Sequence, residues 1–158
     1  MNLSTKFPLI VAAILISSTV CVAQNGSAKP KPSPTPVATV DLQPIRSSPA
    51  YAELLLHKTE LNSDLDSLLV DYTEEYPKVK AIRVELGFLK VEMDRLLAVN
   101  SADAGKLTLA LGQLMLRKVS LETELDVLRT QFKDEHPDVR KAKKKVETFE
   151  SAIKEILG

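Results

Sequence analysis

The segment YTEEYPKV, from Tyr72 to Val79, decides the fold, because it returns sixty positions later as FKDEHPDV, from Phe132 to Val139. The shared positions pair Tyr72, Tyr76 and Pro77 with Phe132, His136 and Pro137. Proline lacks a backbone N–H and disfavours a helical residue before it, yet it is well tolerated as the first residue of a new helix. Acidic side chains just before that proline suit the positive end of the following helix. Each segment therefore predicts the tip of a helical hairpin.

The similarity extends beyond the two tips. When residues 54–97 are laid on residues 114–157, eleven of the forty-four positions are identical and no gap is needed. The identities include leucines of the flanking segments as well as the glutamate, proline and valine of the tips. Self-similarity at a fixed offset indicates a duplicated structural unit.

Each unit contains two apolar stripes, one on either side of its tip. Apolar residues recur at alternating intervals of three and four, which places them on one side of a helix that must pack against another helix. No segment after residue 48 shows the sustained alternation of a strand. We expect an all-α fold of two tandem antiparallel coiled-coil hairpins, running up-down-up-down, with packing as a four-helix bundle as one arrangement. The first hairpin covers residues 49–99 and the second covers residues 100–158.

Capping residues suggest where the helices begin. Ser48 and Pro49 form a typical cap and first turn for the first helix. Asn100 can end the second helix, and Ser101 can cap the third. Gly105 lowers helix stability by about 1 kcal/mol relative to alanine, which favours a later start for the third helix.

Residues before the hairpins are expected to serve export and spacing. Residues 1–23 contain one charge, Lys6, followed by an apolar run with Cys21 and Ala23 at the −3 and −1 places of a cleavage site, the pattern of a signal peptide. The run is shorter than the roughly twenty residues of a spanning helix, and an uncleaved anchor is the alternative. Residues 24–48 are rich in proline and are expected to form a disordered linker, either a semi-rigid tether or a plain terminus.

Composition excludes several classes of partner and chemistry. The 21 basic and 21 acidic residues balance, so no net charge favours nucleic acid or an anionic membrane. The single cysteine lies in the predicted signal peptide, which leaves no thiol for a disulfide, catalysis or metal binding. We expect export to the periplasm or the extracellular space, with membrane contact only if the N-terminal segment stays uncleaved.

No residue pattern predicts an enzyme, a cofactor, a metal or a small-molecule substrate. The two histidines are His57 and His136, and a metal site usually needs three or four ligands. His136 lies near three acids, a cluster that would hold a cation weakly, and an ordinary surface turn is the other interpretation. Motifs of hydrolases, zinc enzymes and phosphate-binding loops are missing.

Lys58 and its counterpart Lys118 lie within an apolar seam. A lysine there either fixes register and oligomeric state or extends its stem so that the charge reaches the edge of the seam. The run from Lys141 to Lys145 is expected to be a solvated face.

A second apolar row distinguishes the two units. The second helix carries Val84, Phe88 and Val91 where the fourth helix carries Lys144, Thr148 and Ser151. We therefore expect the second helix to be covered on both sides and the fourth on one. Leu56 and Leu116 also lie away from the main seams. These apolar residues are expected to contact either the other hairpin or a separate protein chain.

The segment LDSLLVDYTEEYPKVKAIRVEL and, more loosely, LDVLRTQFKDEHPDVRKAKKKV resemble the extracytoplasmic coiled-coil region of polysaccharide chain-length determinant proteins, also called polysaccharide co-polymerases. The resemblance implies a helical hairpin, here duplicated, that self-associates or docks on envelope assembly machinery. The membrane helices and α/β base domain of that family have no recognisable counterpart in this sequence.

We therefore expect an exported, non-enzymatic structural or adaptor protein of the cell envelope, linked to polysaccharide export or assembly. The alternative is a periplasmic helical chaperone that binds unfolded envelope proteins, since such chaperones have a similar size, a signal peptide and helical hairpins. A passive spacer protein is a third option.

Overall fold

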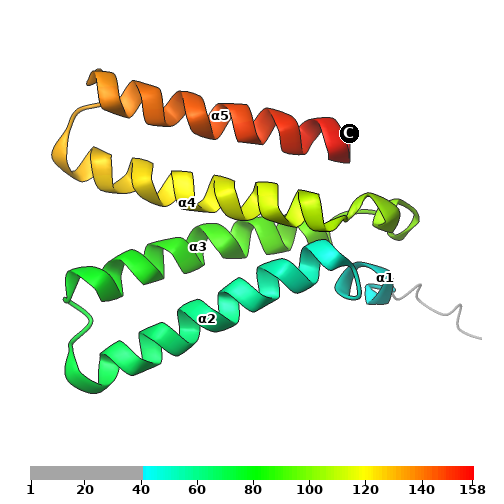
Figure 1. Cartoon of the computed structure of the whole chain (residues 1–158), viewed down its shortest axis with the longest axis horizontal. Helices are drawn as coiled ribbons and strands as arrows, with labels where there is room; N and C mark the ends of the chain where they lie inside the picture. The colour runs from blue at the N-terminus through cyan, green and yellow to red at the C-terminus, as the bar shows by residue number, and fades with distance from the viewer. Residues whose placement is uncertain (1–40) are drawn as a thin grey trace, which may run out of the picture. The chain divides into compact units, whose positions relative to one another are not determined.

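A computed structural model describes residues 41–158, and these residues form an all-α fold without strands (Figure 1). The elements are α1 (Gln43–Arg46), α2 (Pro49–Asp71), α3 (Pro77–Leu97), the short 3₁₀ helix η1 (Ser101–Lys106), α4 (Leu109–Gln131) and α5 (Pro137–Leu157). The predicted signal peptide and residues 24–40 of the predicted linker lie outside the described residues.

Each of the two predicted tips lies between the end of one helix and the start of the next. Pro77 is the first residue of α3 and Pro137 is the first residue of α5. The residue before each proline has an extended backbone, with ψ of 130° at Tyr76 and 137° at His136. Proline excludes the helical conformation from the residue that precedes it, so the turn is fixed locally.

The start of α4 differs from the prediction. Ser101 does not cap this helix; Asn100 Oδ1 accepts a hydrogen bond from the Ala102 backbone N–H at 3.0 Å and begins η1 instead. Thr108 caps α4, because its hydroxyl accepts from the Leu111 N–H at 3.3 Å. The weak helix propensity of Gly105 agrees with this later start.

The folded part of the chain begins before the predicted boundary at Pro49. Residues 43–46 form α1 inside the segment that was expected to be a disordered linker, and Ile45 is fully buried. Ile45 belongs to the main core, against which Leu42 also packs. The prediction of disorder up to residue 48 was therefore wrong for this short segment. Its apolar side chains Leu42 and Ile45 pack against the main core, although the surrounding sequence is rich in proline.

α4 is the central helix of the arrangement. It packs against α5 on one side and against α2 and α3 on the other, and α2 and α3 also pack on each other (Figure 1). α2 and α5 lie on opposite sides of α4 and share no extended contact, so the four long helices do not close into a square bundle. α3 contacts α2 and α4, whereas α5 packs mainly on α4.

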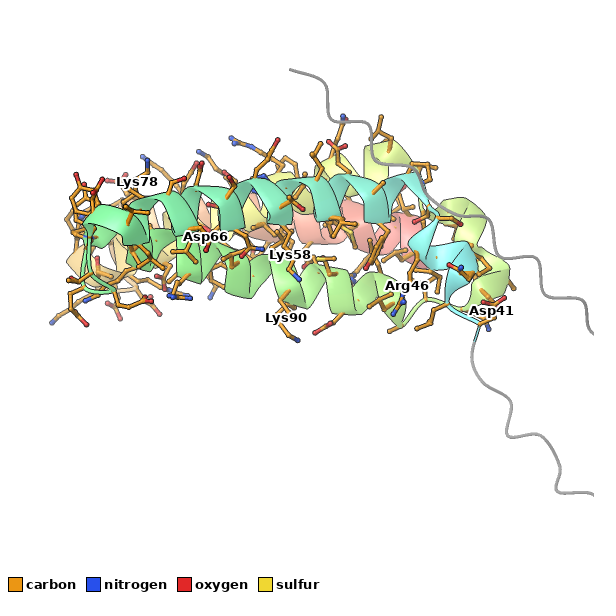
Figure 2. The ribbon with its side chains drawn as sticks, turned by 90° about the horizontal axis from the view of Figure 1, so that it is seen from below. Asp41, Arg46, Lys58, Asp66, Lys78 and Lys90 are labelled. Atoms are coloured by element: carbon orange, nitrogen blue, oxygen red, sulfur yellow. The ribbon has the colours of Figure 1, made fainter. Side chains whose placement is uncertain are left out.

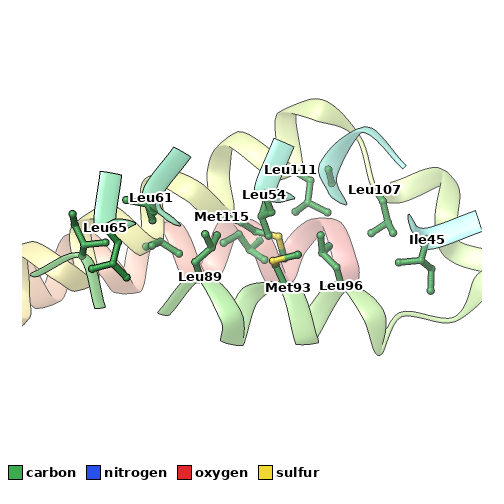
Figure 3. Close-up of a cluster of buried hydrophobic side chains, with 14 of the residues drawn as sticks. Ile45, Leu54, Leu61, Leu65, Leu89, Met93, Leu96, Leu107, Leu111 and Met115 are labelled. Carbon is green, nitrogen blue, oxygen red and sulfur yellow. The ribbon is translucent and has the colours of Figure 1, made fainter. Parts of the chain in front are cut away.

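Two apolar clusters hold the helices together. The larger cluster runs along α2, α3 and α4 and contains the side chains drawn in Figure 3, among them Leu54, Leu89 and Met115, each fully buried. The smaller cluster joins α4 to α5 near the second tip through Leu125, Val139 and Ala142. α5 is thus attached by small side chains near its start and by Ile153 of the main core near its end.

The backbones of α2 and α4 approach each other closely near Ala50 and Gly112. A Cβ atom at Gly112 would lie 3.0 Å from the Ala50 Cα and 3.2 Å from the Ala50 carbonyl oxygen. Ala50 also donates its backbone N–H to the Leu107 carbonyl oxygen at 3.2 Å. Small residues on both helices therefore allow this contact between the two backbones.

We predict that Gly112→Ala destabilises the protein by about 1 kcal/mol, because overpacking against a backbone outweighs the gain in helix propensity. Gly87→Ala is the matched control, since nothing lies within 4 Å of its added methyl group. That variant should gain about 1 kcal/mol from helix propensity alone. Urea unfolding of both variants measures the difference, and equal stabilisation would contradict the close contact.

Candidate functional site

A cluster of charged side chains lies where α3, α4 and α5 meet. Lys118 Nζ of α4 contacts Glu92 Oε1 of α3 at 2.5 Å, Glu122 Oε1 at 3.1 Å and Glu150 Oε2 of α5 at 3.4 Å. Arg95 Nη1 of α3 donates to Glu150 Oε2 at 3.0 Å. We call these five residues the Lys118 cluster. It connects three helices by ion pairs and carries three carboxylates for two cations.

Two charged members of this cluster, Lys118 and Glu92, are almost completely buried. Lys118 is 7 % exposed and Glu92 is 1 % exposed. Glu92 Oε2 forms no hydrogen bond with another group, although Arg95 Nη1 lies 3.8 Å away. A shallow hollow of about 410 Å³, which Val91 and Val146 also line, opens beside the cluster. A buried carboxylate is tolerated only when a cation accompanies it, so Glu92 depends on Lys118.

The pKa values of two members reflect the balance between burial and charge pairing. Burial alone would lower the pKa of Lys118, but its hydrogen bond with Glu92 and the attraction of Glu92 and Glu122 raise that pKa above its ordinary range. Burial alone would raise the pKa of Glu150, but Arg95, followed by Lys118, holds it below its ordinary range. Both groups are therefore charged at neutral pH.

The two seam lysines have different environments. Lys118 is buried among carboxylates, whereas its counterpart Lys58, labelled in Figure 2, is exposed on α2. Lys58 therefore has the solvated charge of the extended-stem interpretation, whereas Lys118 is buried and paired. The sequence prediction missed the partners of Lys118. Glu122 could have been found from its i,i+4 spacing, whereas no local signal indicates that Glu92 faces Lys118.

The structure places the five predicted interface residues in two settings. Phe88 and Leu116 are half-buried and pack against the main core. Val84 is half-buried and lines a hollow of about 150 Å³ together with Val127 of α4, so it lies between α3 and α4. Val91 and Leu56 stay 62 % and 57 % exposed. The first three residues therefore serve contacts within the chain, and the other two remain open to a partner.

The two tips share a stacked pair of rings. The ring centroids of Tyr72 and Tyr76 lie 4.1 Å apart at an interplanar angle of 14°. Those of Phe132 and His136 lie 4.2 Å apart at 20°. In each tip the first ring belongs to the residue that ends one helix and the second to the residue that begins the next. The two stacked rings therefore pack against each other across the turn that joins the helices.

Ion pairs join residues of each tip to an adjoining helix. Glu74 pairs with Arg83 and Glu75 pairs with Lys80 in the first tip. Asp134 pairs with Arg129 at 3.1 Å in the second tip.

His136 Nδ1 accepts a hydrogen bond from the Asp138 N–H at 3.3 Å and so caps α5. Between residues 41 and 158 no group of three or more histidine, cysteine or acidic side chains has the arrangement of a metal site. The structure thus gives His136 a role in the turn itself.

We predict that Lys118→Ala destabilises the protein by about 3–5 kcal/mol, because it leaves Glu92 buried without its cation. Lys58→Ala, the matched control at the equivalent position, should change the free energy of unfolding by at most about 0.5 kcal/mol, since Lys58 is exposed. The double variant Lys118→Met/Glu92→Leu should recover most of the loss. Urea unfolding checks all three, and equal effects at the two lysines would contradict this description.

We predict that stability is nearly constant between about pH 5 and pH 10 and falls outside that range. The raised pKa of Lys118 adds stability below the ordinary lysine value, and this is lost as the pH rises through the folded-state pKa. The lowered pKa of Glu150 adds stability above the ordinary glutamate value, and this is lost as the pH falls through the folded-state pKa.

Unfolding free energies measured in urea from pH 2.5 to pH 7 test the acid limb. Glu150→Gln should flatten that limb, because the amide does not titrate, and Glu124→Gln on the exposed side of α4 should leave it unchanged. An acid limb of the same slope in Glu150→Gln would show that Glu150 does not contribute.

Comparison with known proteins adds no further assignment. No protein-family model, no curated protein and no solved structure matches the chain. None of the helices in the described part of the chain combines the length and the apolar character that crossing a membrane requires. The features that bear on function are therefore the Lys118 cluster, the two tips and the exposed apolar side chains.

Proposed function

We propose that this protein is an exported, non-enzymatic structural or adaptor protein of the cell envelope, linked to polysaccharide export or assembly. In this proposal the α2–α3 and α4–α5 pairs are two tandem antiparallel coiled-coil hairpins that hold protein partners or further copies of the chain. The observation that carries the proposal is the doubled tip, which repeats in sequence, backbone and ring stacking.

The backbone geometry supports a duplicated contact element. The residue that ends the first helix of each pair has φ and ψ of −124° and 157° at Tyr72, and of −132° and 152° at Phe132. Both tips lie at the same end of the described chain, opposite α1 and η1 (Figure 1). A partner that contacts both tips at once would bind more tightly than a partner that contacts one tip.

The tips expose aromatic surface, which is typical of protein contacts. Tyr72 is 46 % exposed and Phe132 is 39 % exposed, although both lie in turns of fixed geometry. Aromatic side chains are enriched at protein interfaces because they bury a large area with few rotatable bonds. A rigid turn that displays such a ring loses little conformational entropy on binding. This is the behaviour expected of an adaptor surface.

The buried charged groups form ion pairs between helices, and this structural use supports a non-enzymatic role. Lys118 and Glu92 pair with each other and hold three helices together, so their burial has a structural explanation. Perturbed pKa values arise in structural ion pairs as well as at catalytic sites. The hollow beside them is shallow and open, whereas small-molecule sites are concave and enclose most of their ligand.

A periplasmic chaperone remains the alternative function. The observation in its favour is on the outer side of α2, where Leu55, Leu56 and Val70 are 43 %, 57 % and 80 % exposed. Exposed apolar groups of this kind can hold unfolded segments. A chaperone would suppress the thermal aggregation of a non-native client in a turbidity assay at substoichiometric to equal molar ratios, and an adaptor would not.

We predict that a photo-crosslinking amino acid at Tyr72 or Phe132 yields a few defined adducts with envelope proteins in the native cells. The same probe at Ser63, an exposed residue in the middle of α2, is the matched control and should yield none of these adducts. The crosslinked bands are identified by mass spectrometry after cell fractionation. Recovery of the protein in the cytoplasmic fraction, or a diffuse ladder of adducts from all three positions, would contradict an adaptor role of the tips.

A further inference from the structure

The outer side of α2 corresponds to the side of α4 that α3 covers. On α4, Lys118 lines one hollow together with residues of α3, and Thr123 lines a second. Met115 and Val119 lie between these two residues around the helix and are fully buried. At the repeat offset of sixty, the counterparts of these four residues on α2 are, in the same order, Lys58, Ser63, Leu55 and Thr59. The duplication therefore gives α2 a copy of the surface that α3 covers on α4.

This surface is covered on α4 and open on α2. Met115 is 0 % exposed, whereas its counterpart Leu55 is 43 % exposed. Leu116 packs against the main core, whereas the identical residue Leu56 is 57 % exposed. α2 lies at one edge of the arrangement, and its outer side has no neighbour within residues 41–158 (Figure 1). The exposed residues that form this open surface, which we call the α2 patch, are Leu55, Leu56, Lys58 and Thr59.

The opposite edge of the arrangement is built differently. α5 is the counterpart of α3 in the repeat and lies on the other side of α4 from α2 (Figure 1). Where α3 has Val84 and Phe88, α5 has Lys144 and Thr148. Within residues 41–158, no large apolar side chain of α5 is exposed. A terminal element with a polar outer face needs no further neighbour, and the two exposed leucines of the α2 patch do not follow that pattern.

The charge of Lys58 indicates what the covering element carries. Its counterpart Lys118 pairs with Glu92 of α3 at 2.5 Å. Lys58 takes part in no ion pair within residues 41–158. A helix that covered the α2 patch as α3 covers α4 would bring an acidic side chain to Lys58, where it would accept a charge-assisted hydrogen bond.

We infer that the α2 patch is the docking surface for an amphipathic helix of another protein, which packs on α2 as α3 packs on α4. This helix presents apolar side chains at intervals of three and four residues to Leu55 and Leu56, and a carboxylate to Lys58. The patch lies in the half of α2 next to α1, away from the tips (Figure 1). The inference rests on the proposed adaptor role and states the chemistry of one of its partners.

A second copy of the chain does not supply such a helix. The α3 helix of a second copy is already covered by its own α2 and α4. The α5 helix of a second copy is accessible, but it has Lys144 where α3 has Val84, and Ala152 where α3 has Glu92. It therefore lacks both the second apolar row and the acid that the α2 patch calls for, so the partner is a different chain.

The test uses a synthetic peptide with the sequence of α3, Pro77–Leu97, as the probe helix, and fluorescence anisotropy measures its binding to the purified chain. Leu55→Glu/Leu56→Glu should weaken binding by about tenfold or more. Leu109→Glu/Val127→Glu is the matched control, because it makes the same change at two α4 side chains that are 48 % and 45 % exposed. Circular dichroism melts confirm that both variants fold.

Charge reversal locates the bound peptide. Lys58, labelled in Figure 2, is exposed, so Lys58→Glu leaves the fold intact and should weaken binding by about tenfold, because it would face Glu92 of the peptide. A peptide with Glu92→Lys should restore binding to this variant. Exchange of the peptide for the α3 helix of the folded chain would not show this dependence, because that site contains Lys118 in place of Lys58.

Binding of the peptide, its loss in the patch variant, its retention in the control variant and its rescue by the charge swap would support the inference. No binding at a peptide concentration of about 1 mM, or equal weakening in the two variants, would overturn it. Equal binding of a scrambled peptide of the same composition would overturn it in favour of unfolded segments. A dimer in light scattering that Leu55→Glu/Leu56→Glu dissociates would overturn it in favour of a second copy.

Failure of these tests and failure of the proposed adaptor role are distinguishable. The crosslinks at Tyr72 and Phe132 report on the tips, at the other end of the helices from the α2 patch (Figure 1). Defined crosslinks at the tips without binding of the peptide would therefore remove the docking surface on α2 and leave the adaptor role standing.

Discussion

The rest of the structure depends on the burial of α4, which packs against three other long helices. Each of its sides must match a different neighbour. Gly112 allows the backbone of α2 to approach closely, and Met115 fills the core between α2 and α3. Lys118 meets α3 and α5 at the point where all three helices converge. The apolar contacts hold α4 in place, and the ion pairs of Lys118 join α3 and α5 to it.

The local features of the fold could be predicted from the sequence. The two tips follow from Pro77 and Pro137, whose effect reaches only one residue back, and the helices follow from apolar spacing. The segment around Ile45 and the cap at Thr108 were missed. Ile45 becomes buried only because the chain brings it into the main core, and a composition average over residues 24–48 does not contain that contact.

The candidate site was predictable only in part, because duplicated residues occupy unequal places. Lys58 and Lys118 have the same setting in the sequence, yet α2 lies at the edge of the arrangement and α4 at its centre. In the sequence, Glu92 is indistinguishable from an exposed acidic residue of α3, and only the contact with Lys118 of α4 sets it apart. Val91 and Val84 lie on one row of α3, yet Val84 faces α4 and Val91 faces solvent. Such differences arise from tertiary packing and leave no local signal.

Native-state hydrogen exchange with resolution of single helices tests the central position of α4 most directly. The helix that is covered on the most sides opens only when the whole domain unfolds, so its amides should exchange most slowly. We expect the greatest protection from Leu111 to Leu125 and earlier exchange in α5, which is attached through small side chains near its start. Equal protection of the α2–α3 and α4–α5 pairs, each opening on its own, would contradict it.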